Sequence, residues 1–185
     1  AKAATVGIVT SSVPGTVANV LTGGAASQTN ANTYAVTADF VPDDAVNYSS
    51  LLAQSAGSFT IAQATPTATL AVNNSPQTYD GAAKSATVGI VTSSVPGAVA
   101  NVLTGGSASQ TNANTYAVTA DFVPSDAANY NTLTGLSAGS FTIDKATPTA
   151  TLAVNNSPQT YDGAAKSATV GIVTSSVPGA VANVL

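Results

Sequence analysis

The stretch Asn-Thr-Tyr-Ala-Val-Thr-Ala-Asp-Phe-Val-Pro, residues 114–124, decides the fold class of this chain. From Tyr116 to Phe122 every second residue is apolar or aromatic, and the residues between them are small or polar. This period of two predicts a β-strand with one buried face. The residues that follow, Val123-Pro124-Ser125-Asp126, predict a turn, because proline suits the second position of a type I turn.

The same stretch stands at residues 32–42, because the whole chain repeats with a period of 82 residues. Overlaying residues 1–103 on residues 83–185 needs no gap and leaves 12 mismatches. A period of this length exceeds the roughly 20–50 residues of solenoid repeats and is typical of an array of small domains, each with its own core. The sequence predicts a partial repeat over residues 1–63, a complete repeat over 64–145 and a partial repeat over 146–185.

Both ends of the sequence fall inside a repeat. A partial repeat buries too little apolar surface to offset the entropy of ordering it. We therefore expect neighbouring copies of the same repeat to complete residues 1–20 and 165–185, within a longer chain or between the chains of a filament.

The composition predicts an all-β protein. Charged residues make up 6% of the chain, and Arg, Glu, His, Cys, Met and Trp do not occur. Helices favour Glu, Lys, Arg and Leu on exposed faces, whereas the abundant Thr and Val favour strands. No apolar run approaches the ~20 residues of a membrane-spanning helix. The net charge of −4 makes nucleic acid and anionic membranes poor partners.

Turn residues divide the complete repeat into six or seven short strands, which predicts a small antiparallel β-sandwich. We expect strands at residues 67–72, 77–79, 86–91, 99–103, 116–122 and 141–143. Residues 86–91 and 99–103 are expected to pair as a hairpin across Val95-Pro96-Gly97.

Four motifs resemble one family. They are Gln-Thr-Tyr-Asp-Gly-x-x-Lys (77–84 and 159–166), Asn-Ala-Asn-Thr-Tyr-Ala-Val (112–118), Ala-Ala-Asn-Tyr-Asn (127–131) and Phe-Thr-Ile-Asp-Lys-Ala-Thr-Pro-Thr (141–149). In this order they resemble the bacterial immunoglobulin-like repeats of the MBG/YDG type, which occur in tandem in large surface and secreted proteins. The resemblance implies tandem immunoglobulin-like β-sandwich domains arranged head to tail, an extracellular or cell-surface location, and an adhesin-like or structural role without catalytic residues.

Tyr116 lies in a sequence that resembles the tyrosine corner of immunoglobulin domains, with Val118 in the place of the second cysteine. We expect its hydroxyl group to bond to nearby backbone. The alternative is a tyrosine that stacks on carbohydrate.

The joint between repeats is short. Few residues separate Phe141-Thr142-Ile143 from the next strand, and Pro148 restricts the backbone there, which predicts a stiff joint and a semi-rigid rod. Independently moving domains are the alternative. Seven of the 12 mismatches fall in residues 43–54 against 125–136, which are expected to form a tolerant surface loop or, alternatively, a variable contact surface.

Catalytic, cofactor and metal sites are not predicted, because the usual base, thiolate and metal ligands are missing. A Ser–Lys dyad at Lys84-Ser85 has no support, because neighbouring residues in a strand point to opposite faces. Calcium at Asp43-Asp44 and isopeptide crosslinks at Lys84 or Lys166 remain open alternatives. The glycosylation sequons at Asn47, Asn73 and Asn155 are frequent by chance in such a sequence.

Two functions remain. The first is a structural spacer in an extracellular bacterial stalk, fibre or filament. The second is a multivalent adhesin in which each repeat binds a glycan or another cell surface weakly. Completion of the ends by other molecules would add polymerisation by strand complementation.

Overall fold

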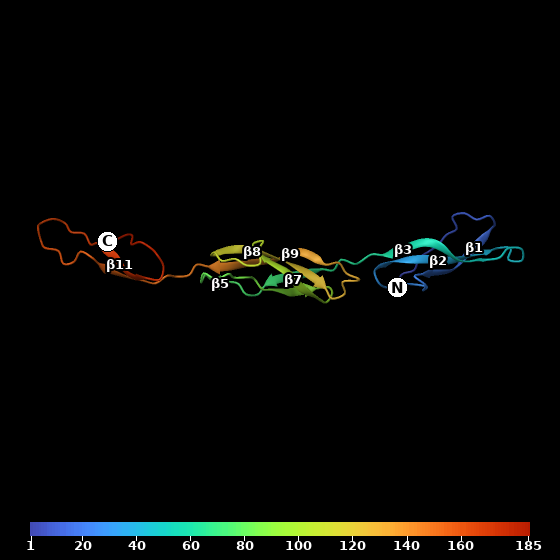
Figure 1. Cartoon of the computed structure of the whole chain (residues 1–185), viewed down its shortest axis with the longest axis horizontal. Coiled ribbons are helices and arrows are strands. Elements are labelled where there is room, and N and C mark those ends of the chain that lie inside the picture. Colours follow the sequence, from blue (N-terminus) through green and yellow to red (C-terminus); the bar gives the residue numbers. More distant parts are fainter.

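The computed structural model describes residues 1–185 and contains eleven strands and no helix, which confirms the all-β prediction. Three bodies follow one another along the long axis (Figure 1). We refer to residues 1–63 as the first region, residues 64–145 as the middle region and residues 146–185 as the last region. No helix in the chain is long and apolar enough to cross a membrane.

The middle region contains two sheets. Antiparallel strands β4 (Ala68–Val72) and β6 (Val88–Ser93) form the smaller sheet. The larger sheet has the order β5 (Gln77–Thr78), β9 (Leu133–Asp144), β8 (Asn114–Pro124) and β7 (Gly97–Thr104). Strand β5 runs parallel to β9, and the other neighbours are antiparallel.

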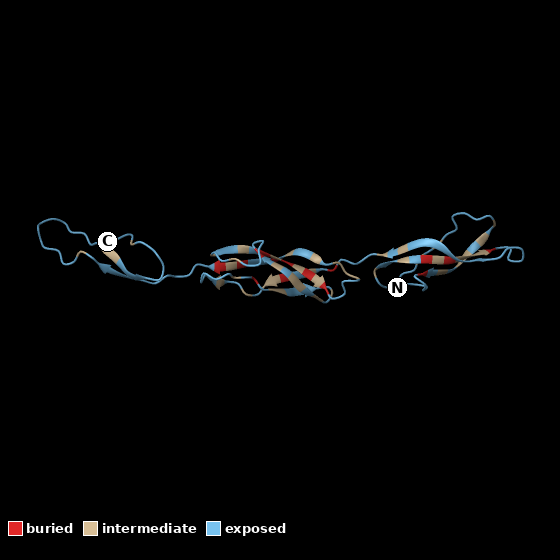
Figure 2. Cartoon of the chain, viewed as in Figure 1, coloured by how far each residue is buried: buried red, intermediate tan, exposed pale blue.

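The two sheets share one hydrophobic core, and most of the buried residues, red in Figure 2, lie in this region. Val118 on β8 is 1% exposed and Phe122 is fully buried, so the predicted alternation along this strand is confirmed. Leu70 on β4 and Ala86 just before β6 meet Phe141 and other residues of β8 and β9 in this core. The core therefore joins the smaller sheet to β8 and β9.

The predicted hairpin between residues 86–91 and 99–103 is wrong. Strand β6 pairs with β4, whereas β7 pairs with β8, with Gly97 opposite Pro124. A Cβ atom on Gly97 would lie 2.5 Å from Cζ of Phe122, so only glycine lets β7 approach β8 this closely. Proline and glycine predicted the turn correctly, but turn residues do not specify the pairing partner of the following strand.

Residues 125–136 are a surface turn only in their first part. Strand β9 begins at Leu133, so the loop prediction is wrong for residues 133–136, as it is for residues 51–54 at the start of β3. The pairing of β9 with β8 is irregular there, and Gly135 has a φ of +65°. This β-bulge breaks the period of two, which is why the sequence pattern did not show the strand.

The outer regions contain parts of the same arrangement. In the first region, β1 (Gly15–Thr22), β2 (Asn32–Pro42) and β3 (Leu51–Ile61) form an antiparallel sheet in chain order. In the last region, β10 (Ala150–Val154) pairs with β11 (Val170–Ser175).

Candidate functional site

Tyr116 has the structural role that its sequence context predicted. Its hydroxyl group donates a hydrogen bond to the carbonyl oxygen of Asn112 at 2.8 Å, and Tyr34 donates to Asn30 in the same way at 2.9 Å. The Tyr116 ring packs against the core. The tyrosine corner therefore fixes the loop that precedes β8, and the equivalent loop before β2.

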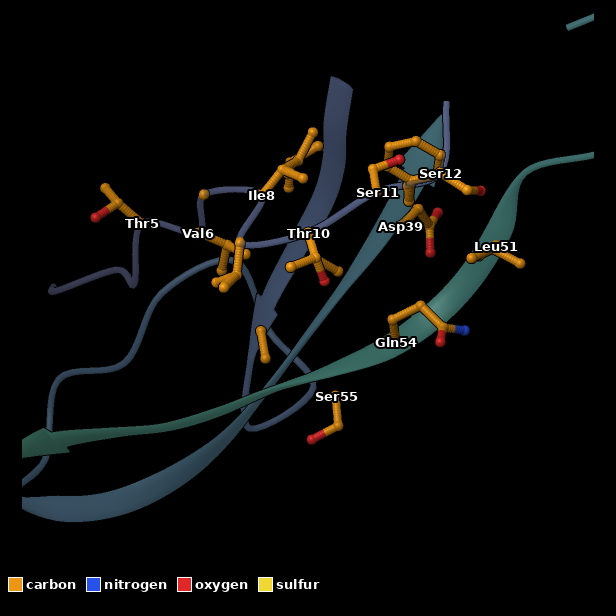
Figure 3. A pocket seen from close by; sticks show the side chains of 16 residues that line it. Thr5, Val6, Ile8, Thr10, Ser11, Ser12, Asp39, Leu51, Gln54 and Ser55 are labelled. Carbon is orange, nitrogen blue, oxygen red and sulfur yellow. The ribbon is translucent and has the colours of Figure 1, made fainter. Parts of the chain in front are cut away.

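The first region has an open hollow of about 680 Å³ between residues 5–12 and strands β1 to β3 (Figure 3). Its lining is mostly apolar or hydroxyl-bearing, and Asp39 is the one ionisable residue in it. In the middle region, residues 87–94 are the equivalents of 5–12; they contain β6, which pairs with β4. The hollow thus corresponds to a position that β4 and its Leu70 fill in the middle region, and it lacks the convergent polar groups of a ligand site.

Asp39 and its equivalent Asp121 have a structural use that the sequence analysis missed. Asp121, on the central strand β8, accepts hydrogen bonds from Nδ2 of Asn101 on β7 at 2.6 Å and from the backbone N–H of Gly135 on β9 at 2.8 Å. The first of these bonds, with the second in support, holds the pKa of Asp121 below its ordinary value. The sequence signal that could have indicated this role is an aspartate in the middle of an alternating strand.

Lys84 is half-buried, with 20% of its side chain exposed, and it pairs with an exposed carboxylate. Its Nζ atom forms an ion pair with Asp80 at 2.6 Å, and the Asp80 side chain is 56% exposed. This hydrogen bond from Lys84, with the backbone N–H of Ala82 in support, lowers the pKa of Asp80. Lys166 pairs with Asp162 in the same way. An isopeptide crosslink needs a carboxyl group in the core beside the lysine, and neither pair supplies one.

Of the two aspartates considered for calcium, Asp44 forms hydrogen bonds within its own turn. Asp44 accepts hydrogen bonds from the backbone N–H of Asn47 at 3.2 Å and from its Nδ2 at 2.8 Å. No group of three or more carboxylate, histidine or cysteine side chains lies together in the chain. Asp44 caps this turn as the N-cap residue of a helix does, with its carboxylate on the backbone N–H three residues on.

The joint between the first and middle regions is a hydrogen-bonded segment. Six residues, 62–67, separate β3 from β4. Within it the backbone N–H of Ala64 donates to the carbonyl oxygen of Asn129 at 2.9 Å, and the carbonyl oxygen of Ala64 accepts from the N–H of Asn131 at 2.9 Å. Nε2 of Gln63 also donates to the carbonyl oxygen of Ala127 at 2.8 Å. The chain therefore has no free linker at this joint.

The two packed sheets, the tyrosine corner and the order of the motifs are features of the middle region, and one family model matches there. Residues 68–147 match the family model of the MBG domain. The match contains all six strands of the middle region, β4 to β9, and confirms the resemblance seen in the sequence. No curated protein and no solved structure matches the chain. The Asn129 turn, which meets the first region, lies inside the MBG match, whereas Ala64 lies just outside it.

Proposed function

We propose that this chain is a semi-rigid spacer segment of an extracellular bacterial stalk, fibre or filament. In this proposal, immunoglobulin-like β-sandwich domains follow one another head to tail, with residues 64–145 as one complete domain and residues 1–63 and 146–185 as parts of two others. The MBG match supports a repeat module of a surface protein. The observation that carries the spacer role is the joint, where Ala31 and Gln63 of the preceding domain donate hydrogen bonds to Asn129 and Ala127 in a turn of the next domain.

The proposal gives the chain no catalytic role and no cofactor. The ionisable side chains with shifted pKa values, such as Asp121 and Asp80, are used in bulges and turns. None of them lies beside an activated nucleophile of the kind that catalysis needs.

Neighbouring copies of the repeat are the proposed partners. Leu70 is 8% exposed in the middle region, whereas the identical Leu152 is 55% exposed in the last region. A copy of the strands that cover Leu70 would cover Leu152 in the same way, from the same chain or from another one.

The length of arrays with increasing repeat number tests the spacer role. The long strands β8 and β9 have 11 and 12 residues. At ~3.3 Å per residue, we expect each added repeat to lengthen the particle by a constant ~30–45 Å in small-angle scattering and electron microscopy. A particle that grows with the square root of repeat number would refute the spacer role, because that is the behaviour of freely jointed domains.

Weak multivalent adhesion is the second candidate. The observation that favours it is that Tyr79, which follows β5, is exposed to solvent, since exposed aromatic rings can stack on sugars. A glycan array probed with the chain tests this candidate. Binding that is lost in Tyr79→Ala, Tyr161→Ala chains would support it.

A further inference from the structure

The turn formed by residues 126–131 of the middle region makes contacts at two separate places on the side of the first region. One is the linker, where Ala64 pairs with the backbone of Asn129 and Asn131. The other is the loop before β2, where the backbone N–H of Ala31 donates to Oδ1 of Asn129 at 2.6 Å. A turn that binds both a linker and the domain behind it constrains the position of one domain relative to the other.

Asn129 is at the centre of these contacts. Its Oδ1 accepts from Ala31, and its carbonyl oxygen accepts from Ala64. Its Nδ2 donates to Oδ2 of Asp126 at 2.8 Å, which orients the side chain. Replacing Asn129 therefore removes the direct bond to the loop of the first region and the bond that holds its own turn in shape.

Both sides of this contact are held in place before they meet. The tyrosine corner holds the receiving loop, because Tyr34 bonds to the carbonyl oxygen of Asn30. The carboxylate of Asp126 holds the turn, because its Oδ1 accepts from the backbone N–H of Asn129 and its Oδ2 accepts from Nδ2 of Asn129. Contacts between parts that are already ordered cost little conformational entropy on formation.

We propose that the turn at residues 126–131 is an interdomain clasp whose partner is the preceding copy of the same domain. The inference rests on the proposed spacer function and names the residues that would stiffen it. The clasp binds the loop at Asn30-Ala31 and the linker at Gln63–Thr65, where Oγ1 of Thr65 accepts from Nδ2 of Asn131. The tyrosine corner thereby orders the loop of its own domain that also forms the contact between domains.

Both halves of the clasp recur with the 82-residue period. The receiving residues Asn30, Ala31, Ala64 and Thr65 are repeated as Asn112, Ala113, Ala146 and Thr147. The turn residues Asp126, Asn129 and Tyr130 are repeated as Asp44, Asn47 and Tyr48. The differences are Lys145 for Gln63, Val46 for Ala128 and Ser49 for Asn131. The same clasp can therefore form at successive joints of an array.

The test compares Asn129→Ala with Asn47→Ala in the full chain. Both variants lose the same bonds to the aspartate of their own turn, but only Asn129 contacts another domain in this chain. In the unmodified chain, we expect the amide of Ala31 to exchange hydrogen more slowly than that of Ala113, which has no such partner. In Asn129→Ala, exchange at Ala31 should rise about five- to tenfold, the effect of one lost hydrogen bond. Exchange at Ala64 should rise less, because its acceptor is the backbone carbonyl of residue 129, which alanine keeps, and only the bond that orients the turn is lost. In Asn47→Ala, exchange at these two residues should not change.

Equal exchange at Ala31 in the unmodified and Asn129→Ala chains would overturn the clasp. Protection of the Val118 amide shows whether the middle region remains folded. If Asn129→Ala unfolds it, Gln63→Ala replaces that variant, because it removes the bond to Ala127 from the neighbouring side. We then expect a smaller rise at Ala64, and no rise would overturn the proposal.

The outcomes separate the clasp from the spacer role. Flexible arrays with slow, Asn129-dependent exchange at Ala31 would refute the spacer and support the clasp. Rigid arrays in which Asn129→Ala changes neither the exchange at Ala31 nor the scattering would support the spacer and overturn the clasp.

Discussion

The middle and last regions contain one sequence in two environments. Residues 64–103 and 146–185 are identical, yet Leu70 is buried and Leu152 is mostly exposed. Strand β4 packs on β9, whereas β10 has only β11 beside it. Pairing within the small sheet is the same in both regions, with Leu70 opposite Ile90 and Leu152 opposite Ile172. Strand pairing is therefore local, but burial depends on strands that come later in the repeat.

The first region lacks the smaller sheet, whereas the last region lacks the larger one. It has the equivalents of β7, β8 and β9 with nearly the same register, but its Phe59 and Ile61 are only half-buried. Their equivalents, Phe141 and Ile143, are fully buried under β4. Of the seven core residues, five lie on β8 and β9, one on β4 and one just before β6. The smaller sheet therefore supplies the minority of the core but is needed to bury Phe141 and Ile143 completely.

The largest expected difference in stability is between the Phe141→Ala and Phe59→Ala variants. Removing a fully buried phenylalanine costs about 3–5 kcal/mol, whereas removing the half-buried Phe59 should cost less than half of that. Hydrogen exchange at Val118 and at Val36 in the full chain measures the two regions separately. Equal losses would show that the small sheet does not bury Phe141 as the structure indicates.

Leu70→Ala and Leu152→Ala make the sharpest pair, because their sequence contexts are identical. We expect about 2–4 kcal/mol of destabilisation for the buried Leu70 and less than about 1 kcal/mol for the exposed Leu152. Exchange at amides of β8 measures the first effect, and exchange at amides of β11 measures the second. If Leu152→Ala has the larger effect, the last region is covered by a partner in solution.

The sequence predicted what is local and periodic. Tyr116 to Phe122 predicted the central strand, its buried face and, through the tyrosine corner, a hydrogen bond. It did not predict that β6 and β7 lie in different sheets, since proline and glycine at a turn leave the next partner open. Nor did it predict the proposed clasp, because Asn129 is one of many asparagines and its contacts depend on a segment 65 residues earlier, at Ala64.

The bulge at Gly135 allows a smaller comparison. Gly135 and its equivalent Ala53 both have a positive φ, at +65° and +51°. A Cβ atom on Gly135 would meet no other atom within 4 Å, so the effect of a substitution is backbone strain alone. We expect Gly135→Ala to destabilise the middle region by about 1 kcal/mol and Ala53→Gly to stabilise the first region by a similar or smaller amount. Hydrogen exchange in β8 and β2 measures both, and a destabilised Ala53→Gly chain would contradict the strain at Ala53.

The smallest effect is an acid dependence centred on the same bulge. Hydrogen bonds from Asn101 and Gly135 lower the pKa of Asp121 below its ordinary 3.8, so the folded state favours the carboxylate. This stabilisation is fully present above pH 3.8 and is lost as the pH falls through the lowered pKa.

Asp121→Asn should therefore lower the stability of the middle region near pH 7. It should also make the stability of that region fall less steeply in acid, while the first region is unchanged. The first region, where Asp39 has the equivalent bonds from Asn19 and Ala53, should keep its acid dependence and serve as the control. An acid titration monitored by exchange at Val118 and Val36 checks this. If the two regions keep the same acid profile in the variant, the bulge carboxylate does not contribute and the bond from Asn101 is only a surface contact.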